Sequence, residues 1–152
     1  MRLNGYEPRF IHLADEINRA MPEYVVELIA AALNQRRRCL NGAKVLALGV
    51  AYKREVGDTR ESPAIEILVK LREKGSEIAY VDPYVPSLDL HGTTLKSVDL
   101  TDEELASADC VVILTDHSAF DYGRVVEGAR LVVDPRNATW GLPVADDRVV
   151  RI

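Results

Sequence analysis

The sequence predicts an α/β protein: a parallel, Rossmann-like open sheet with helices on both faces, preceded by a helical leader. From Lys44 onward, short apolar runs alternate with helical segments, and Asp-Pro or Thr-Asp pairs follow the later runs. Strands separated by helices pair in parallel through right-handed crossovers. The leader is predicted by the helical spacing of apolar residues in the first forty positions. We therefore divide the chain into a helical segment, residues 1–40, and an α/β domain, residues 41–152.

The leader has a helical pattern from Pro8 to Arg38. Its second half is apolar on more than one side, which is more than a solitary surface helix needs. Pro22 lacks the backbone N–H that a helix interior uses. The sequence therefore predicts a turn or kink over residues 18–22, with Pro22 near the first turn of a second helix.

The α/β part begins after Asn41-Gly42, a pair that ends the leader helix. Ser62 is the expected N-cap of the next helix, with Pro63 at its first position. An irregular stretch follows Pro83. In chain order, the predicted elements are strand Lys44–Leu48, helix Ser62–Lys74, strand Ile78–Val81, helix Asp102–Ala106, strand Val111–Leu114, helix Tyr122–Glu127 and strand Leu131–Val133.

Composition excludes several classes of function. The 152 residues carry a net charge of −5, which argues against a nucleic-acid partner. No apolar run approaches the ~20 residues of a membrane span, and no signal-peptide pattern is present, so we expect a cytoplasmic protein without a membrane partner. The two cysteines and three histidines lack metal-ligand spacing, so no metal site is expected. Neither a P-loop nor a G-x-S-x-G elbow occurs.

The loop after the first predicted strand is the most informative segment. Residues 49–63 read Gly-Val-Ala-Tyr-Lys-Arg-Glu-Val-Gly-Asp-Thr-Arg-Glu-Ser-Pro. A loop between a strand and a helix presents free backbone N–H groups and the positive end of a helix dipole. Lys53, Arg54 and Arg60 add positive charge, so we expect the loop to receive an anion, a phosphate in particular. The G-x-G-x-x-G spacing of a dinucleotide site is absent.

The carboxyl ends of the strands carry the other candidate residues, because ligands of open α/β sheets bind there. Tyr52 could stack on a base, Lys53 could meet a phosphate, and the fork of Arg136 could hydrogen-bond a ribose or base. The alternatives are that Tyr52 covers the sheet edge, that Lys53 is a solvated charge, and that Arg60 pairs with Asp58. Three aspartates are expected to form turns at the strand ends rather than to catalyse: Asp82, Asp116 and Asp134.

Five ordered stretches then carry a family resemblance: Gly49-Val-Ala-Tyr-Lys53, Gly57-Asp-Thr-Arg-Glu-Ser-Pro63, Tyr80-Val-Asp-Pro-Tyr-Val-Pro86, Leu114-Thr-Asp-His-Ser-Ala-Phe120 and Val133-Asp-Pro-Arg-Asn137. Through them, residues 44–137 resemble the C-terminal UDP-binding domain of the UDP-glucose and UDP-N-acetylhexosamine 6-dehydrogenases. The leader resembles the end of that family's central helical domain. The leader, the Asp-His-Ser-Ala-Phe stretch at residues 116–120 and the Arg-Asn-Ala-Thr stretch at residues 136–139 are most similar to the UDP-N-acetylglucosamine or -mannosamine branch.

The resemblance implies roles for four residues. Tyr52 and Lys53 match the pair that holds the UDP-sugar, Arg136 matches an arginine that contacts the nucleotide, and Arg60 matches one that reaches the NAD pyrophosphate. The UDP pyrophosphate is then expected at Lys53 and at the N–H groups of residues 49–52.

The resemblance also implies what this chain lacks. The family oxidises C6 of a UDP-sugar to a carboxylate in two NAD-dependent steps, through a covalent intermediate on a cysteine. Neither Cys39 nor Cys110 matches the Gly-rich motif of that cysteine, and the NAD-binding domain is absent from these residues. We therefore expect no catalytic residue here, no NAD binding by this chain alone, and dependence on the N-terminal NAD-binding and central domains.

Two other functions stay open. The apolar excess on Tyr24–Leu33 suits a helix-mediated homodimer or interaction module with a vestigial nucleotide site. A receiver-type or flavodoxin-like domain would explain the acids at the strand ends, with an aspartate such as Asp82 as phosphate acceptor. The first strand, however, lacks a paired acidic cluster.

Overall fold

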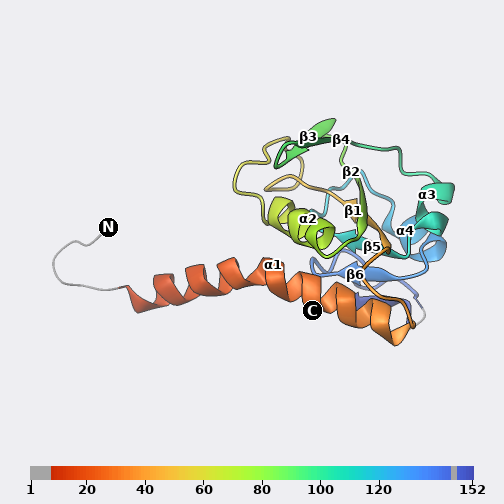
Figure 1. Ribbon diagram of the computed structural model, residues 1–152, viewed down its shortest axis with the longest axis horizontal. Helices are drawn as coiled ribbons and strands as arrows, with labels where there is room; N and C mark the ends of the chain where they lie inside the picture. The colour runs from red at the N-terminus through yellow and green to blue at the C-terminus, as the bar shows by residue number, and fades with distance from the viewer. Residues whose placement is uncertain (1–7, 145–146) are drawn as a thin grey trace.

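A long helix attached to a three-layer α/β body makes up the protein, as the computed structural model of residues 8–144 and 147–152 shows (Figure 1). The central sheet has the strand order β2-β1-β5-β6-β7, and every pairing in it is parallel. Its strands are β1 Lys44–Leu48, β2 Glu77–Val81, β5 Cys110–Ile113, β6 Val132–Asp134 and β7 Val149–Arg151. The predicted open parallel sheet is confirmed.

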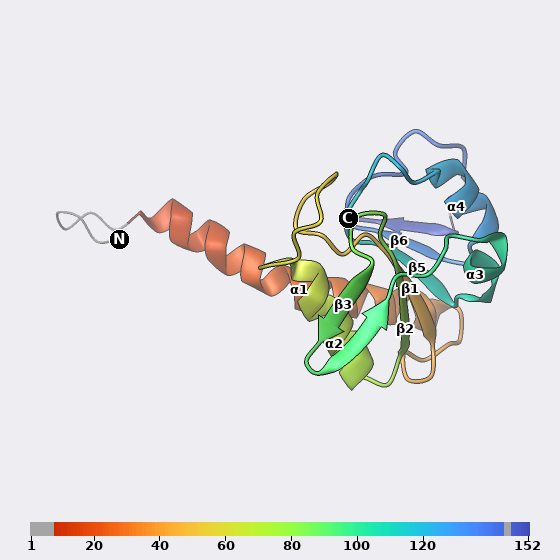
Figure 2. The same ribbon diagram turned by 90° about the horizontal axis from the view of Figure 1, so that it is seen from above.

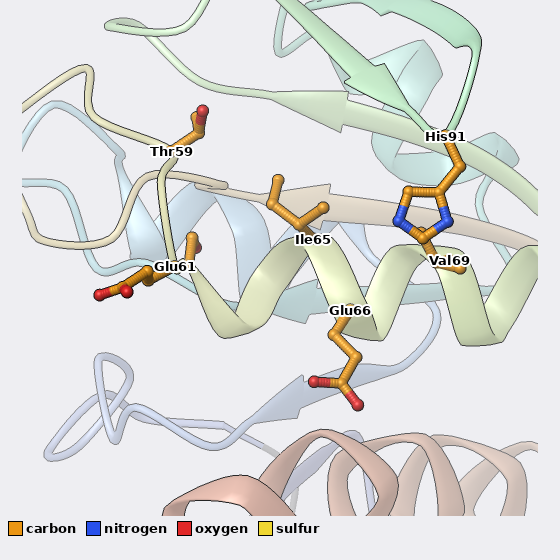
Figure 3. Close-up of a pocket in the computed structure, with 7 residues that line it drawn as sticks. Thr59, Glu61, Ile65, Glu66, Val69 and His91 are labelled. Atoms are coloured by element: carbon orange, nitrogen blue, oxygen red, sulfur yellow. The ribbon is translucent and has the colours of Figure 1, made fainter.

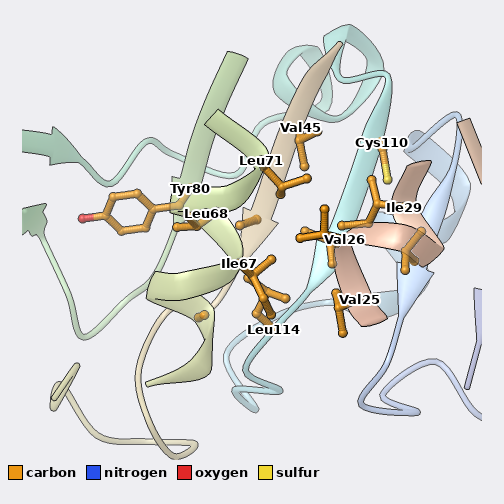
Figure 4. Packing of buried hydrophobic residues seen from close by; sticks show 14 of the residues in the cluster. Val25, Val26, Ile29, Val45, Ile67, Leu68, Leu71, Tyr80, Cys110 and Leu114 are labelled. Carbon is orange, nitrogen blue, oxygen red and sulfur yellow. The ribbon is translucent and has the colours of Figure 1, made fainter. Parts of the chain in front are cut away.

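Helices cover both faces of this sheet (Figures 1 and 2). They are α1 Arg9–Gln35, α2 Pro63–Glu73, α3 Asp102–Ser107 and α4 Tyr122–Gly128. Side chains of α1 and α2 pack with Val45 of β1, as Figure 4 shows, whereas α3 and α4 pack with Leu46. Neighbouring residues of a strand point to opposite faces, so an almost wholly apolar strand can serve two cores at once.

The leader is one continuous helix, so of the turn or kink predicted over residues 18–22 the turn is wrong, and no second helix begins at Pro22. Pro22 lies inside α1 and is buried. Directly after it, Val25, Val26 and Ile29 are buried against the sheet. An interior proline removes one hydrogen bond and crowds the carbonyl four residues earlier, at a cost of about 3 kcal/mol. The apolar packing that begins at this point outweighs that loss, and α1 continues through it.

The two halves of α1 lie in different surroundings. The second half packs across the sheet and against α2, whereas the first half projects away from the α/β body (Figures 1 and 2). Apolar side chains on the projecting half are therefore exposed, including Phe10 at 82% and Ile17 at 54%. The second half of α1 contributes directly to the core of the α/β body. The division of the chain into two parts at residue 40 therefore stays a prediction.

Two features were not predicted from the sequence. The stretch after Pro83 contains an antiparallel hairpin, β3 Ser87–Leu90 and β4 Thr93–Lys96, and the chain ends on the sheet strand β7. His91 and Gly92 connect the hairpin with φ values of 48° and 85°. Two positive φ values in a two-residue turn suit the twist of a hairpin. The signal is weak in sequence because histidine stands where asparagine is usual.

The strand order places the expected site. β1 lies between β2 and β5, so the chain leaves β1 in one direction and returns on its other side. In an open sheet, the crevice beyond the carboxyl ends at such a reversal is where ligands bind. The loops after β1 and β5 flank this crevice. At the far end of the β1 loop, the Ser62 hydroxyl accepts the Ala64 N–H at 3.3 Å, which confirms the predicted N-cap of α2.

Candidate functional site

Tyr52 and Lys53 lie on the outer surface of the loop after β1. The Tyr52 side chain is half-buried, and the Lys53 Nζ lies 5.4 Å from the centre of its ring. An ammonium at this distance is attracted to the negative face of the ring. Lys53 makes no ion pair with any residue of the described part of the chain. Both groups are therefore available to a ligand.

The backbone N–H groups of this loop are already hydrogen-bonded. Gly49 N–H donates to the Val81 carbonyl at 2.9 Å and Tyr52 N–H to the Asp58 carbonyl at 2.7 Å. The N–H groups of residues 50 and 51 donate to Asp82 Oδ2 at 2.7 and 3.2 Å. The expectation that these four groups cradle a pyrophosphate is wrong for this structure, because all four are already hydrogen-bonded, two of them to the Asp82 carboxylate and two to backbone carbonyls.

Asp82 also contacts His117. The His117 ring is fully buried, its Nε2 lies 3.1 Å from Asp82 Oδ2, and its Nδ1 accepts the Glu55 N–H at 2.9 Å. Asp82 is 3% exposed and additionally accepts the Tyr84 N–H. A phosphate-acceptor role for Asp82, as a receiver domain would need, does not fit a carboxylate buried in this way. Asp82 is a structural acceptor that joins the loops after β1, β2 and β5.

Glu55 ties the β1 loop to the β5 loop a second time. Its carboxylate accepts the Ser118 hydroxyl at 2.6 Å and the Ser118 N–H at 2.8 Å. These hydrogen bonds favour the ionised form and lower the pKa of Glu55. Glu55 has a φ of 63°, a left-handed conformation that non-glycine residues seldom adopt. The contacts on both its backbone and its side chain hold it there.

Arg136 lies at the same edge of the sheet, at the end of β6. Its guanidinium is 3.3 Å from Asp116 Oδ1, and Arg54 approaches the other oxygen of Asp116 at 3.8 Å. One carboxylate of the β5 loop therefore stands between an arginine of the β1 loop and an arginine of the β6 loop. Both arginines are at least half exposed, so a ligand can reach their guanidinium groups.

A buried aspartate shapes the segment that carries Arg136. Asp134 is 0% exposed and accepts the N–H groups of residues 136, 138 and 139 as well as the Thr139 hydroxyl. The expectation that Asp134 forms a turn is confirmed. Its carboxylate fixes the backbone from which the Arg136 side chain extends.

Arg60 pairs with Asp58, as one of the two interpretations of the sequence anticipated. Its Nε and Nη2 contact the two carboxylate oxygens at 3.0 and 2.8 Å. The hydrogen bonds from Arg60 lower the pKa of Asp58 from 3.8 to about 2. The Arg60 side chain is 87% exposed, so the pair lies in solvent.

A separate hollow of about 390 Å³ lies beside the start of α2. Figure 3 shows Ile65 and Val69 on the helix facing the hairpin residue His91, with Glu61 near the helix start. None of the four predicted site residues lines it. Its acidic side chains, Glu61 and Glu66, do not suit a phosphate. The candidate site is therefore the loop edge and not this hollow.

The cysteines do not contribute a reactive group to the site. Cys39 is exposed beyond the end of α1, and Cys110 is buried within β5. Burial raises the pKa of the Cys110 thiol to about 12. In the described ranges, residues 8–144 and 147–152, no group of His, Cys, Asp or Glu side chains is arranged to hold a metal ion.

Comparison with known proteins identifies the family. The UDP-glucose/GDP-mannose dehydrogenase family, UDP binding domain, matches residues 46–140. The chain belongs to this family. The resemblance carried by the five sequence stretches is thereby confirmed, and the matched region contains Tyr52, Lys53, Arg60 and Arg136.

Relatives with curated names cover most of this chain. The chain is 36% identical over 112 residues to a UDP-N-acetyl-D-mannosamine dehydrogenase of Methanococcus maripaludis, a match that covers 74% of the chain and 24% of that protein. It is 34% identical over 130 residues to the enzyme of that name from Escherichia coli K12, with coverage of 82% and 30%. The chain spans less than a third of the length of these relatives.

Solved structures share the fold. The UDP-D-ManNAc dehydrogenase of Pyrococcus horikoshii matches 97% of this chain and 34% of its own, with a TM-score of 0.78 and 26% identity. The UDP-N-acetyl-mannosamine dehydrogenase Cap5O of Staphylococcus aureus matches 98% of this chain and 35% of its own, with a TM-score of 0.71 and 27% identity. Both likenesses include the helical leader.

Proposed function

We propose that this chain binds the UDP part of a UDP-sugar at the carboxyl edge of its sheet. The single observation that carries the proposal is the charge of Lys53 at the sheet edge, which is unpaired within the described residues. Lys53 lies beside a half-buried tyrosine, at the crevice where the strand order reverses. Membership in a family defined by its UDP binding domain supplies the ligand class.

Three side chains divide the work of binding. Lys53 meets the pyrophosphate as a point charge, and the exposed face of Tyr52 packs against a ring of the ligand. The Arg136 guanidinium exchanges its contacts with Asp116 for contacts with the nucleotide. Its contacts with Asp116 are long, 3.3 Å, and solvent-exposed, so exchanging them for a ligand oxygen costs little. The loop N–H groups stay with Asp82 and the neighbouring carbonyls.

The complete protein is proposed to oxidise C6 of a UDP-N-acetylhexosamine to a carboxylate. The names of the relatives, UDP-N-acetyl-D-mannosamine dehydrogenase, support that substrate class. NAD, when bound, supplies the hydride acceptor. The residue of this chain suited to NAD is Arg60, whose exposed guanidinium presents a fork that fits a pyrophosphate once it leaves Asp58. One arginine does not make a dinucleotide site, so the remaining contacts and the catalytic cysteine belong to other domains.

Calorimetric titration with UDP, with AMP as the control nucleotide, tests the proposal. We expect saturable heat with UDP and none with AMP. A folded sample with a sharp thermal transition and no response to UDP would contradict it. Tyr52→Ala serves as a matched variant, because it removes an exposed ring and should weaken binding without altering the fold.

Self-association through α1 is a second candidate function. The projecting half of the helix exposes Phe10, Ile11, Leu13 and Ile17, and no described residue of the α/β body covers them. A stripe of apolar residues at helical spacing suits a second helix of the same kind. Sedimentation velocity tests this: the wild-type chain should dimerise as its concentration rises, and Ile17→Asn should prevent it, whereas Glu16→Gln should not. A monomeric wild type at high concentration would contradict it.

The proposed location is the cytoplasm, where UDP-sugars are oxidised under this proposal. None of the helices within the described residues is long and apolar enough to cross a membrane. Both cysteines are free thiols, one of them exposed, a state that a reducing compartment maintains.

A further inference from the structure

The segment that carries Tyr52 and Lys53 is held at both of its ends by one pair of buried side chains. At its start, the N–H groups of Val50 and Ala51 donate to Asp82. At its end, the Glu55 N–H donates to His117 Nδ1 at 2.9 Å. Asp82 and His117 also contact each other at 3.1 Å. The positions of the Tyr52 and Lys53 side chains therefore depend on the contact between the Asp82 carboxylate, at the end of β2, and the His117 imidazole, after β5.

The contacts of His117 determine its tautomer. Nδ1 can accept the Glu55 N–H only if it carries no proton, so the neutral ring carries its proton on Nε2 and donates it to Asp82. The same carboxylate thus accepts from the ring and from two loop N–H groups. A tautomer with the proton on Nδ1 would bring two donors together at the Glu55 contact and leave Nε2 without a proton for Asp82.

The surroundings of His117 hold the ring rigidly. It packs against the Tyr84 ring at a centroid distance of 4.9 Å and against Phe120 at 5.7 Å, and its own carbonyl accepts the Tyr122 hydroxyl. The charged groups that face it are Asp82 on one side and the Glu55 carboxylate, 4.0 Å from Nδ1, on the other. The ring has no exposed surface, so it cannot itself touch a ligand.

We propose that His117 is a positioning residue for nucleotide binding, which in its Nε2–H form sets the place of Tyr52 and Lys53 and thereby the affinity for a UDP-sugar. This proposal rests on the proposed function of the loop edge. Without the Nδ1 acceptor, the Glu55 N–H has no partner at this end of the segment. The end of the loop then shifts, and the affinity for the ligand falls.

Binding measurements on three proteins test the role of His117. The ligand is UDP-N-acetylglucosamine, in which both phosphates are esterified. Its charge therefore stays constant near neutral pH, whereas the terminal phosphate of UDP titrates near pH 6. At pH 8, His117→Phe keeps an aromatic ring but neither polar contact, and we expect at least a tenfold loss of affinity. His117→Asn keeps an acceptor near the Nδ1 position and should recover part of that loss. His12→Asn, on the exposed half of α1, is the control and should bind as the wild type does.

Rescue by the conservative variant separates positioning from a purely structural role. At pH 8, His117→Asn should regain part of both the ligand affinity and the slow amide exchange of residues 50–55 that His117→Phe loses. Amide exchange of residues 50–55 should speed up in His117→Phe while the core strands keep their protection. Equal ligand affinity in the wild type and His117→Phe would overturn the positioning proposal alone. Absence of binding by the folded wild type would overturn the proposed function, and this proposal with it.

A measurement on the wild type decides the matter if His117→Phe fails to fold. Nitrogen NMR of the imidazole distinguishes protonated from unprotonated ring nitrogens. At pH 8 we expect a proton on Nε2 and none on Nδ1. A proton on Nδ1 at that pH would overturn the proposal, since the Glu55 contact then cannot exist as described.

Discussion

Gly49 lies directly against the backbone of Thr115. A Cβ atom at Gly49 would stand 2.3 Å from the Thr115 carbonyl oxygen and 2.6 Å from Thr115 Cβ. Gly49 also has a φ of 76°, in the region that side chains disfavour. The Thr115 hydroxyl, in turn, donates to the Ala51 carbonyl at 2.6 Å. The loops after β1 and β5 thus meet backbone to backbone, and this contact fixes the floor of the candidate site.

Gly49→Ala should therefore be strongly destabilising. Left-handed strain costs about 1–2 kcal/mol, and forcing a methyl group into a filled space adds about 1–3 kcal/mol. Gly42→Ala is the matched control, because Gly42 has a φ of 81° but open space around its Cβ position. Denaturant unfolding should show the strain alone for Gly42→Ala and a clearly larger loss for Gly49→Ala. Similar losses would mean that the Thr115 contact relaxes easily.

Lys53→Ala should weaken UDP binding far more than Arg54→Ala does. Losing a charge-assisted contact costs about 1.5–3 kcal/mol, or roughly ten- to hundredfold in affinity. Arg54 is already engaged with Asp116 at 3.8 Å and is 60% exposed, so we expect its loss to change affinity by less than about fivefold. Calorimetry on both variants measures the difference. Equal losses would indicate a diffuse positive field in place of a defined contact.

The two thiols should differ sharply in reactivity. Cys39 is exposed, whereas burial raises the pKa of Cys110 to about 12 and keeps it protonated. Titration with a thiol reagent at pH 8 should label one cysteine per folded chain and both in denaturant. Cys39→Ser should abolish labelling of the folded chain. Labelling of Cys110 in the native protein would show that β5 opens readily.

Asp58 should titrate at an unusually low pH. The Arg60 hydrogen bonds lower the pKa of Asp58 to about 2 from an ordinary 3.8. Because the folded-state pKa is the lower one, the stabilising contribution is present above pH ~4 and is lost as the pH falls through about 2. Carbon NMR of the carboxylates can follow this titration. In Arg60→Ala the pKa of Asp58 should return toward 3.8; an unchanged pKa would exclude the arginine as the cause.

Local signals predicted much of the fold. Strands β1, β2, β5 and β6 and the Ser62 cap follow from apolar runs and from a serine-proline pair, which act over a few neighbouring residues. Pro22 misled the prediction because the packing of Val25 and Val26 against the sheet, a tertiary effect, keeps α1 intact through it.

The candidate site could be predicted only in part, for a similar reason. Tyr52, Lys53 and Arg136 are indicated by their place at strand ends. The hydrogen bonds from the loop N–H groups to Asp82 could not be predicted from neighbouring residues, because Asp82 lies about thirty residues further along the chain. His117 was missed because its partners come from two other loops. The signal that was present is the Thr-Asp-His-Ser stretch within the family motif, which places the imidazole directly after a buried strand.

Mapping of the UDP site by amide NMR tests the central claim most directly. On titration with UDP, we expect chemical-shift changes concentrated in the loops after β1, β5 and β6, with Lys53 and the segment around Arg136 most affected. The hollow beside α2 should show none. Shifts centred on that hollow, or no shifts at saturating UDP in the folded chain, would contradict the assignment of the sheet edge as the UDP site.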